Sequence, residues 1–277
     1  SALWLKSQGF EVDIAPVDEK GFVDVKALAS LIRSDTTLVS VMAVNNEIGS
    51  IQPIKAISEL LADKPTISFH VDAVQALAKI PTEKYLTDRV DFATFSSHKF
   101  HGVRGVGFIY IKSGKKITPL LTGGGQERDY RSTTENVAGI AATAKALRLA
   151  MEKLDLFISK TSQMKAVIRQ ALLDYPDIFV FSDEDDFAPH ILTFGIKGVR
   201  GEVIVHAFED YDIFISTTSA CSSKAGKPAG TLIAMGVDKD KAQSAVRLSL
   251  DLENDMSQVE QFLTKLKLIY NQTRKVR

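Results

Sequence analysis

Residues 69–75 read Phe69-His70-Val71-Asp72-Ala73-Val74-Gln75, and residues 92–99 read Phe92-Ala93-Thr94-Phe95-Ser96-Ser97-His98-Lys99. Each stretch is a short apolar run that ends in polar side chains, which is typical of a buried strand of a parallel sheet. In open sheets of this kind, ligands bind beyond the carboxyl ends of the strands. We therefore expect Asp72 and Lys99 to lie at the same edge of one sheet.

The segments around these two stretches alternate between strand and helix patterns. The predicted strands are residues 10–14, 37–44, 66–71, 92–95 and 107–111. Asp24 is expected to cap one helix and Pro53 to open another. The order predicts an α/β fold with a mostly parallel sheet. Asn46 follows the strand at 37–44, so it is expected at the same edge as Asp72 and Lys99.

The second half of the chain has a different organisation. Residues 136–175 form a long Ala- and Leu-rich helical stretch, which we expect to be interrupted. Beyond it, short strands are predicted at residues 178–181, 190–196, 213–217 and 245–250, and helices at residues 202–208 and 256–270. The expected organisation is a large domain over residues 1–150 and a smaller C-terminal α+β domain over residues 151–277.

Composition limits the possible classes of protein. The chain has 277 residues, of which 45% are hydrophobic, and 34 basic residues balance 34 acidic ones. This balance gives no global field that would favour nucleic acid or a membrane surface. A single cysteine excludes an intrachain disulfide framework and favours a cytoplasmic location. No apolar run is long enough to span a membrane, and no signal peptide is visible.

The start of the chain is unusual. The first residue is Ser1, and residues 1–6 resemble the middle of a helix that lacks a cap. We expect that upstream sequence is missing, through processing or trimming.

Lys99 and Asp72 together fit the requirements of a pyridoxal 5'-phosphate (PLP) site. A lysine amine can form a Schiff base with PLP, an aspartate can keep the pyridinium nitrogen protonated, and Gln75 can bond the phenolic oxygen. The alternative for Lys99 is a solvated surface charge, and for Asp72 a helix cap. Lys99 lies between two apolar segments, however, and burial there would lower its pKa and suit imine chemistry.

Four further positions have both a structural and a functional interpretation. Asn46 lies in an Asn-rich stretch that could form a turn, or its amide could bind a cofactor or a carboxylate. Thr134 follows a glycine-rich loop and precedes a helix, where a phosphate could bind. Arg247 is either a surface charge or a bidentate clamp on a carboxylate. Cys221 is either inert or, in polar surroundings near Lys224 and Lys227, a nucleophile.

Six segments in the same order resemble the NifS/IscS-type cysteine desulfurases, which are PLP enzymes of fold type I. The matching segments are residues 44–49, 70–75, 96–99, 123–128, 219–223 and 247–250. The resemblance covers nearly the whole chain. It implies the large-domain fold, a homodimer, L-cysteine as substrate and an acceptor protein for sulfur. From the balanced charge and the lack of a long apolar run, we expect no direct contact to nucleic acid and no membrane.

The resemblance also implies roles for individual residues. Lys99 would hold PLP and move protons, Asp72 and Gln75 would contact the ring, Ser96 and His98 would bind the phosphate, and Thr134 would reach it from the partner subunit. Asn46 and Arg247 would hold the substrate carboxylate. Cys221 would take the sulfur as a persulfide, leaving L-alanine. The segment around Cys221 is similar to desulfurases dedicated to tRNA or thiamine thiolation, and delivery to iron–sulfur clusters is a further possibility.

Several features depart from the family pattern. The family's upstream phosphate loop and the histidine that stacks on PLP have no counterpart, because the chain begins after them. Asp129 and Thr133 stand where glycines are usual, and Val103-Arg104 stands where Pro-Lys is common. We expect these substitutions to have small effects. Two alternatives stay open: a truncated, inactive desulfurase-like fragment, and another fold type I enzyme such as an aminotransferase or selenocysteine lyase.

Overall fold

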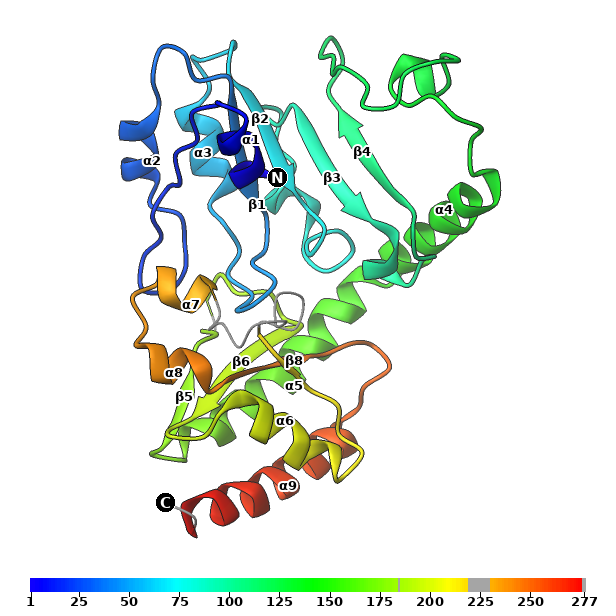
Figure 1. The fold of residues 1–277 in the computed structure, drawn as a ribbon. Helices are drawn as coiled ribbons and strands as arrows, with labels where there is room; N and C mark the ends of the chain where they lie inside the picture. Colours follow the sequence, from blue (N-terminus) through cyan, green and yellow to red (C-terminus); the bar gives the residue numbers. More distant parts are fainter. Residues whose placement is uncertain (184, 219–229, 276–277) are drawn as a thin grey trace.

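The structure, a computed structural model, describes residues 1–183, 185–218 and 230–275 (Figure 1). The described strands form two four-stranded sheets, with orders β1-β2-β3-β4 and β5-β6-β8-β7. The first sheet occupies the upper half of Figure 1 and the second sheet the lower half.

The first sheet is mostly parallel, as predicted. Its strands are β1 (Leu38–Met42), β2 (Ser68–Asp72), β3 (Phe92–Ser96) and β4 (Gly107–Ile111). β1, β2 and β3 are parallel, and β4 is antiparallel to β3. One face of the sheet packs on the helices and forms a core around Phe69, Val71 and Ala93, none of which is exposed to solvent.

Three helices accompany the first sheet in the sequence before β2. They are α1 (Ala2–Ser7), α2 (Val25–Leu31) and α3 (Ile54–Leu60). The Asp24 carboxylate caps α2 by accepting the backbone N–H groups of Lys26 and Ala27, which confirms that cap. Pro53 is the residue before α3, and α1 has no side-chain cap, both as predicted.

The second sheet is antiparallel throughout. Its strands are β5 (Ile178–Val180), β6 (Ile191–Ile196), β7 (Ser216–Thr217) and β8 (Ala245–Ser249). The helices that follow the first sheet are α4 (Val137–Glu152), α5 (Leu154–Leu173), α6 (Gly201–Glu209), α7 (Gly230–Ala234), α8 (Lys239–Gln243) and α9 (Met256–Lys275). A second core joins this sheet to α5, α6 and α9.

The long helical stretch is interrupted at Lys153, as predicted. Lys153 ends α4 and precedes α5, with φ −108° and ψ 8°. Apolar side chains of α4 pack on the core of the first sheet, whereas α5 packs on the core of the second. The two consecutive helices therefore run from one sheet to the other, as the green ribbon of Figure 1 shows.

Two expectations about strands are wrong. Residues 10–14 form no strand, since Phe10 and Ile14 are 62% and 77% exposed and no described strand pairs with them. An alternating pattern becomes a strand only where a neighbour supplies its hydrogen bonds. The continuous apolar run over residues 37–44 is typical of a buried parallel strand, but only one face of β1 is buried, and Leu38 and Met42 are exposed on the other.

Candidate functional site

The carboxyl ends of β1, β2 and β3 meet at one edge of the first sheet. Met42 at the end of β1 pairs with Asp72 at the end of β2, and Asp72 pairs with Thr94 of β3. Asn46 follows β1, and Lys99 follows β3. The register therefore places the segments that carry Asn46, Asp72 and Lys99 on the same edge, which confirms that part of the prediction.

Lys99 lies in a short 3₁₀ turn, η2 (Ser97–Phe100), that is closed at both ends. The buried Ser97 donates its N–H to the Val106 carbonyl at 3.0 Å and accepts the N–H of Gly102 at 2.9 Å. Its hydroxyl is 2.9 Å from that of Thr143 on α4. Packing thus fixes the backbone of the turn around the lysine.

The Lys99 side chain is half-buried. The apolar neighbours Phe95 and Phe100 turn into the core, whereas the lysine lies at the surface of the turn. Among the described residues, Lys99 makes no hydrogen bond or ion pair. Its amine is therefore accessible to a ligand.

Asp72 and Gln75 follow the end of β2 in a series of turns. The Ala73 carbonyl accepts N–H groups from both Ala76 and Leu77, but the segment forms turns and not an α-helix. Asp72 is exposed, and its carboxylate accepts the Val74 N–H at 3.1 Å. Gln75 is half-buried. The carboxylate retains further acceptor positions for a ligand.

The side chains of Ser96 and His98 flank the Lys99 turn. Ser96 is half-buried and His98 is exposed. Within the described part of the chain, neither side chain has a hydrogen-bond partner, and the same holds for Gln75. The edge therefore presents a hydroxyl, an imidazole, an amide and an amine that are all free to bind.

His70 is a residue of this edge to which the sequence analysis gave no role. Its ring nitrogens lie 2.8 Å from the Ser40 hydroxyl and 3.1 Å from the Thr94 hydroxyl, so the ring joins β1, β2 and β3. Burial lowers the pKa of His70, although the nearby Asp72 opposes this. The sequence could have indicated that His70 lies beside Asp72, because the two residues are two positions apart on β2 and such residues face the same side of a sheet.

Arg247 on β8 contacts the segment that carries Asn46. Its guanidinium donates to the Asn46 backbone carbonyl at 2.8 Å and to the Ser216 hydroxyl at 3.2 Å. The Asn46 side chain is exposed and bonds to no described residue. The two predicted carboxylate-binding residues are therefore adjacent, although 201 positions separate them in the sequence.

Asn45, next to Asn46, has a structural role. Its side-chain oxygen accepts the N–H groups of Glu47 and Ile48, and its amide donates to the Thr231 hydroxyl at 3.2 Å. Glu47 accepts the Thr231 N–H at 3.1 Å. These contacts fix the start of α7 on the loop after β1.

The predicted nucleophile Cys221 lies outside the described residues.

Thr134 lies in the long segment between β4 and α4. This segment extends beyond β4, the edge strand of the first sheet (Figure 1). Thr134 is exposed and has no hydrogen bond to the described residues around Lys99. Asp129 and Thr133 have φ of 67° and 151°, in the region that favours the glycines usual at these positions.

A group of buried basic residues lies between the two sheets. Lys79, Lys165 and His190 are 7%, 6% and 5% exposed. Burial, together with Lys79, Lys165, Lys99 and Arg247, lowers the pKa of His190 to about 3. The imidazole is therefore neutral, and its surroundings are positively charged. Such a field favours an anionic ligand at the neighbouring edge of the sheet.

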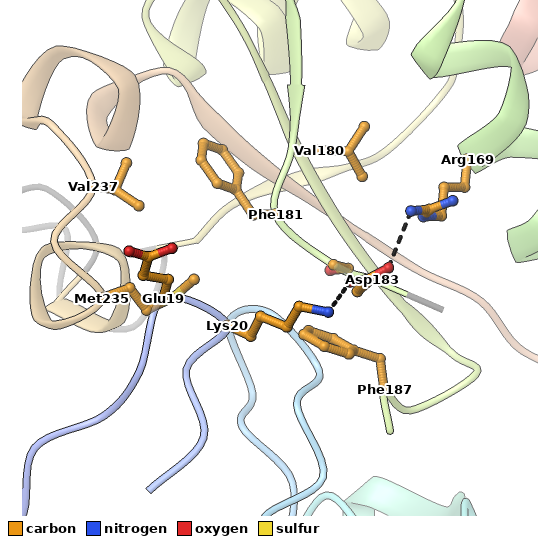
Figure 2. A pocket seen from close by; sticks show the side chains of 10 residues that line it. Glu19, Lys20, Arg169, Val180, Phe181, Asp183, Phe187, Met235 and Val237 are labelled. Carbon is orange, nitrogen blue, oxygen red and sulfur yellow. Dashed lines mark hydrogen bonds and ion pairs between the residues drawn. The ribbon is translucent and has the colours of Figure 1, made fainter. Parts of the chain in front are cut away.

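A separate cavity of about 210 Å³ lies elsewhere on the molecule (Figure 2). Its walls include Phe181, Phe187 and Met235, and Asp183 at its rim bonds Lys20 at 2.6 Å and Arg169 at 3.1 Å. None of the predicted site residues lines it. This cavity is therefore distinct from the edge that carries Lys99.

Two other kinds of site are absent from the described residues. No three of the histidine, aspartate and glutamate side chains placed by the structure are grouped to hold a metal ion. None of the helices in the described ranges has the length and hydrophobicity needed to cross a bilayer.

Comparison with known proteins matches this arrangement to one family. The aminotransferase class-V profile matches residues 2–262. A NifS/IcsS protein homolog of Lactobacillus delbrueckii subsp. bulgaricus is 50% identical over 273 residues, which cover 98% of this chain and 71% of the relative. The cysteine desulfurase IscS of Clostridium botulinum (strain Hall) is 39% identical over 280 residues, covering 100% and 70%.

A solved structure described as a NifS-like protein superposes with a TM-score of 0.88 at 36% identity, covering 97% of this chain and 70% of that one. Sequence and structure thus agree, and the chain belongs to the aminotransferase class-V family, among the NifS/IscS cysteine desulfurases of PLP fold type I.

Proposed function

We propose that this chain is a PLP-dependent cysteine desulfurase that removes sulfur from L-cysteine and leaves L-alanine. The observation that carries the proposal is the accessible amine of Lys99, which lies at the same sheet edge as the carboxylate of Asp72. A lysine and an aspartate in this relation are what a PLP enzyme requires.

The polar groups at this edge fit PLP. The ring nitrogen requires a carboxylate, the phenolic oxygen requires a hydrogen-bond donor, and the phosphate requires several donors. The edge offers all of these groups, and they make few hydrogen bonds to other described residues. The residues proposed to hold the cofactor are Lys99, Asp72, Gln75, Ser96 and His98, with Thr134 from a partner subunit. When bound, PLP supplies a conjugated electron sink for the reacting carbon of the substrate.

Asn46 and Arg247 are proposed to bind the substrate carboxylate. Arg247 is held in place by the Asn46 carbonyl and the Ser216 hydroxyl. A guanidinium oriented in this way can form a bidentate pair with a carboxylate. The adjacent exposed amide of Asn46 would supply a further donor. Substrate binding would therefore join a residue after β1 to a residue on β8.

Cys221 is proposed to take the sulfur. A new bond forms between its sulfur and the substrate sulfur as the carbon–sulfur bond of the substrate breaks. The electron pair remains with the carbon, which takes a proton from the Lys99 amine and becomes the methyl group of L-alanine. Lys224 and Lys227, three and six positions after Cys221 in the sequence, would favour the thiolate that this attack requires.

The same proposal includes the organisation and partners of the protein. We propose domains at residues 1–150 and 151–277, since α4 packs on the first sheet and α5 on the second. We also propose a homodimer, a sulfur-acceptor protein as partner, and a cytoplasmic location, with no direct nucleic-acid or membrane partner.

The test is to add PLP and L-cysteine to the full chain and measure L-alanine and the mass of Cys221. We expect borohydride to trap PLP on Lys99, and a persulfide to form on Cys221. Lys99→Ala should abolish the trapped adduct, whereas the exposed Lys145→Ala on α4 should keep it.

Cys221→Ser separates the alternatives. In a desulfurase this variant should still trap PLP but lose sulfur transfer. Transamination that survives in this variant, without desulfuration in the parent chain, would instead indicate an aminotransferase. Failure of the parent chain to bind PLP would indicate the inactive fragment and overturn the proposal.

A further inference from the structure

Asp251 connects the second sheet to the turn that carries Lys99. It follows β8, four residues after Arg247. One of its carboxylate oxygens lies 3.1 Å from His101 Nε2 and 3.7 Å from Lys79 Nζ. Its other oxygen accepts the Leu252 N–H at 2.6 Å, so the carboxylate is also held by its own segment.

The two partners of Asp251 belong to the two segments that form the Lys99 edge. His101 follows the η2 turn directly and adopts φ 64°, the left-handed conformation that ends the turn. Lys79 ends the series of turns that begins after Asp72. One carboxylate therefore contacts the segments of both Lys99 and Asp72, whereas Arg247, on the strand before it, contacts the segment of Asn46.

Lys79 brings a buried charge to this contact. It is 7% exposed, and its ammonium lies 4.3 Å above the ring of Phe157, with the Asp251 carboxylate as its counter-charge. Burial lowers the pKa of Lys79, and Asp251 opposes this effect. A buried ammonium that loses its carboxylate is poorly compensated by an aromatic face alone. Removing the Asp251 charge should therefore move Lys79 and the turn to which it belongs.

His101 carries the effect to Lys99. The imidazole is exposed, at 65%, but its backbone closes the turn, because the next N–H, of Gly102, bonds the Ser97 carbonyl. We propose that Asp251 is a positioning residue that holds the Lys99 turn against the second sheet through His101 and Lys79. It acts on the reaction by fixing the lysine amine, and this inference rests on the function proposed above.

The position of the amine matters because Lys99 is the group proposed to move protons. A displacement of about 1 Å in a catalytic group can cost about 100-fold in rate. A contact that holds the turn from the other sheet should therefore affect kcat more than the binding of cysteine.

The test compares Asp251→Asn, which removes the charge and keeps the shape, with Asp251→Glu, which restores the charge. Glu253→Gln is the matched control, since Glu253 is exposed and bonds to no described residue. With the PLP-loaded full chain, we expect Asp251→Asn to lower kcat for L-alanine formation about tenfold or more, with KM changing less than about threefold. Asp251→Glu should recover part of kcat, and Glu253→Gln should match the parent.

Hydrogen exchange of the Gly102 amide provides a readout that does not depend on activity. If Asp251 holds the turn, this amide should exchange about fivefold faster or more in Asp251→Asn and unchanged in Glu253→Gln. An unchanged exchange rate would overturn the inference, as would faster exchange with an unaltered kcat. If the parent chain produces no alanine, the proposed function fails, but the exchange measurement still decides whether Asp251 holds the turn.

Discussion

Replacement of His190 should change how the stability of the fold depends on pH. The imidazole is 5% exposed, and both ring nitrogens lack a hydrogen-bond partner among the described residues. Burial and the cations Lys79, Lys165, Lys99 and Arg247 lower its pKa from 6.5 to about 3. As the pH falls through 6.5, the unfolded chain takes up a proton at this position and the folded chain does not. Acid should therefore destabilise the fold, and this effect should continue until the pH approaches 3.

The size of the effect follows from linkage. Between about pH 7 and about pH 5, a single group with these two pKa values contributes a loss of about 2 kcal/mol in the free energy of unfolding. His190→Leu has a similar volume and cannot titrate. The free energy of unfolding of the parent chain should therefore fall by about 2 kcal/mol more than that of the variant over this range, because the other groups titrate in both.

The assay is urea unfolding at several pH values in this range, followed by circular dichroism. His206→Leu is the control, since that side chain is 75% exposed, on α6. This substitution should change the free energy of unfolding by less than about 0.5 kcal/mol. Parallel stability curves for the parent and His190→Leu would refute the reasoning, since they would mean that His190 gains a proton as readily in the folded chain as in the unfolded one.

Three further predictions concern the first sheet and its loops. Asp91 is 2% exposed; burial would raise the pKa of its carboxyl, but the Phe69 N–H, Arg89 and Lys115 outweigh burial and lower it. Asp91→Ala should lower the free energy of unfolding by about 3 kcal/mol at neutral pH, and by less as the pH falls through the lowered pKa of Asp91. Urea unfolding of the parent and the variant at neutral and at acidic pH would measure this difference. Gly102→Ala should lower PLP retention measured by borohydride trapping and destabilise the fold by about 1–3 kcal/mol, because its added Cβ would lie 1.9 Å from the buried Ser97 hydroxyl oxygen. Thr133→Gly should raise the unfolding free energy by about 1 kcal/mol, more than Asp129→Gly, because a β-branched residue tolerates positive φ less well than aspartate; equal melting temperatures for the two variants would contradict this.

The sequence was sufficient to predict the order of the elements and the edge of the site. Apolar runs ended at Asp72 and before Lys99, and parallel strands end at the same side of a sheet, so the edge followed from local pattern alone. An interruption of the long helical stretch was also expected, although not its position, which the structure places at Lys153. These features depend on neighbours in the sequence, and local patterns determine them well.

Contacts between distant segments were not predictable in the same way. A lysine in a sequence is ordinarily interpreted as exposed, yet Lys79 and Lys165 are buried because two sheets pack around them. The approach of Asp251 to His101 joins positions that no spacing rule relates. The strand expected over residues 10–14 failed for the related reason that its pattern was local and its partner strand was not present among the described residues.

The net charge of the whole chain did not indicate the positive charge that surrounds His190. The chain is neutral overall, with 34 basic and 34 acidic residues, and this balance alone indicated no charged ligand. Around His190, however, four cations lower the pKa of one imidazole, and the Asp251 carboxylate lies 3.7 Å from one of them, Lys79. Positive charges that gather in one region favour the binding of an anion nearby. The phosphate of PLP and the carboxylate of an amino acid would both supply that balance at the neighbouring sheet edge, so binding of cofactor and substrate should also stabilise the contact between the two sheets.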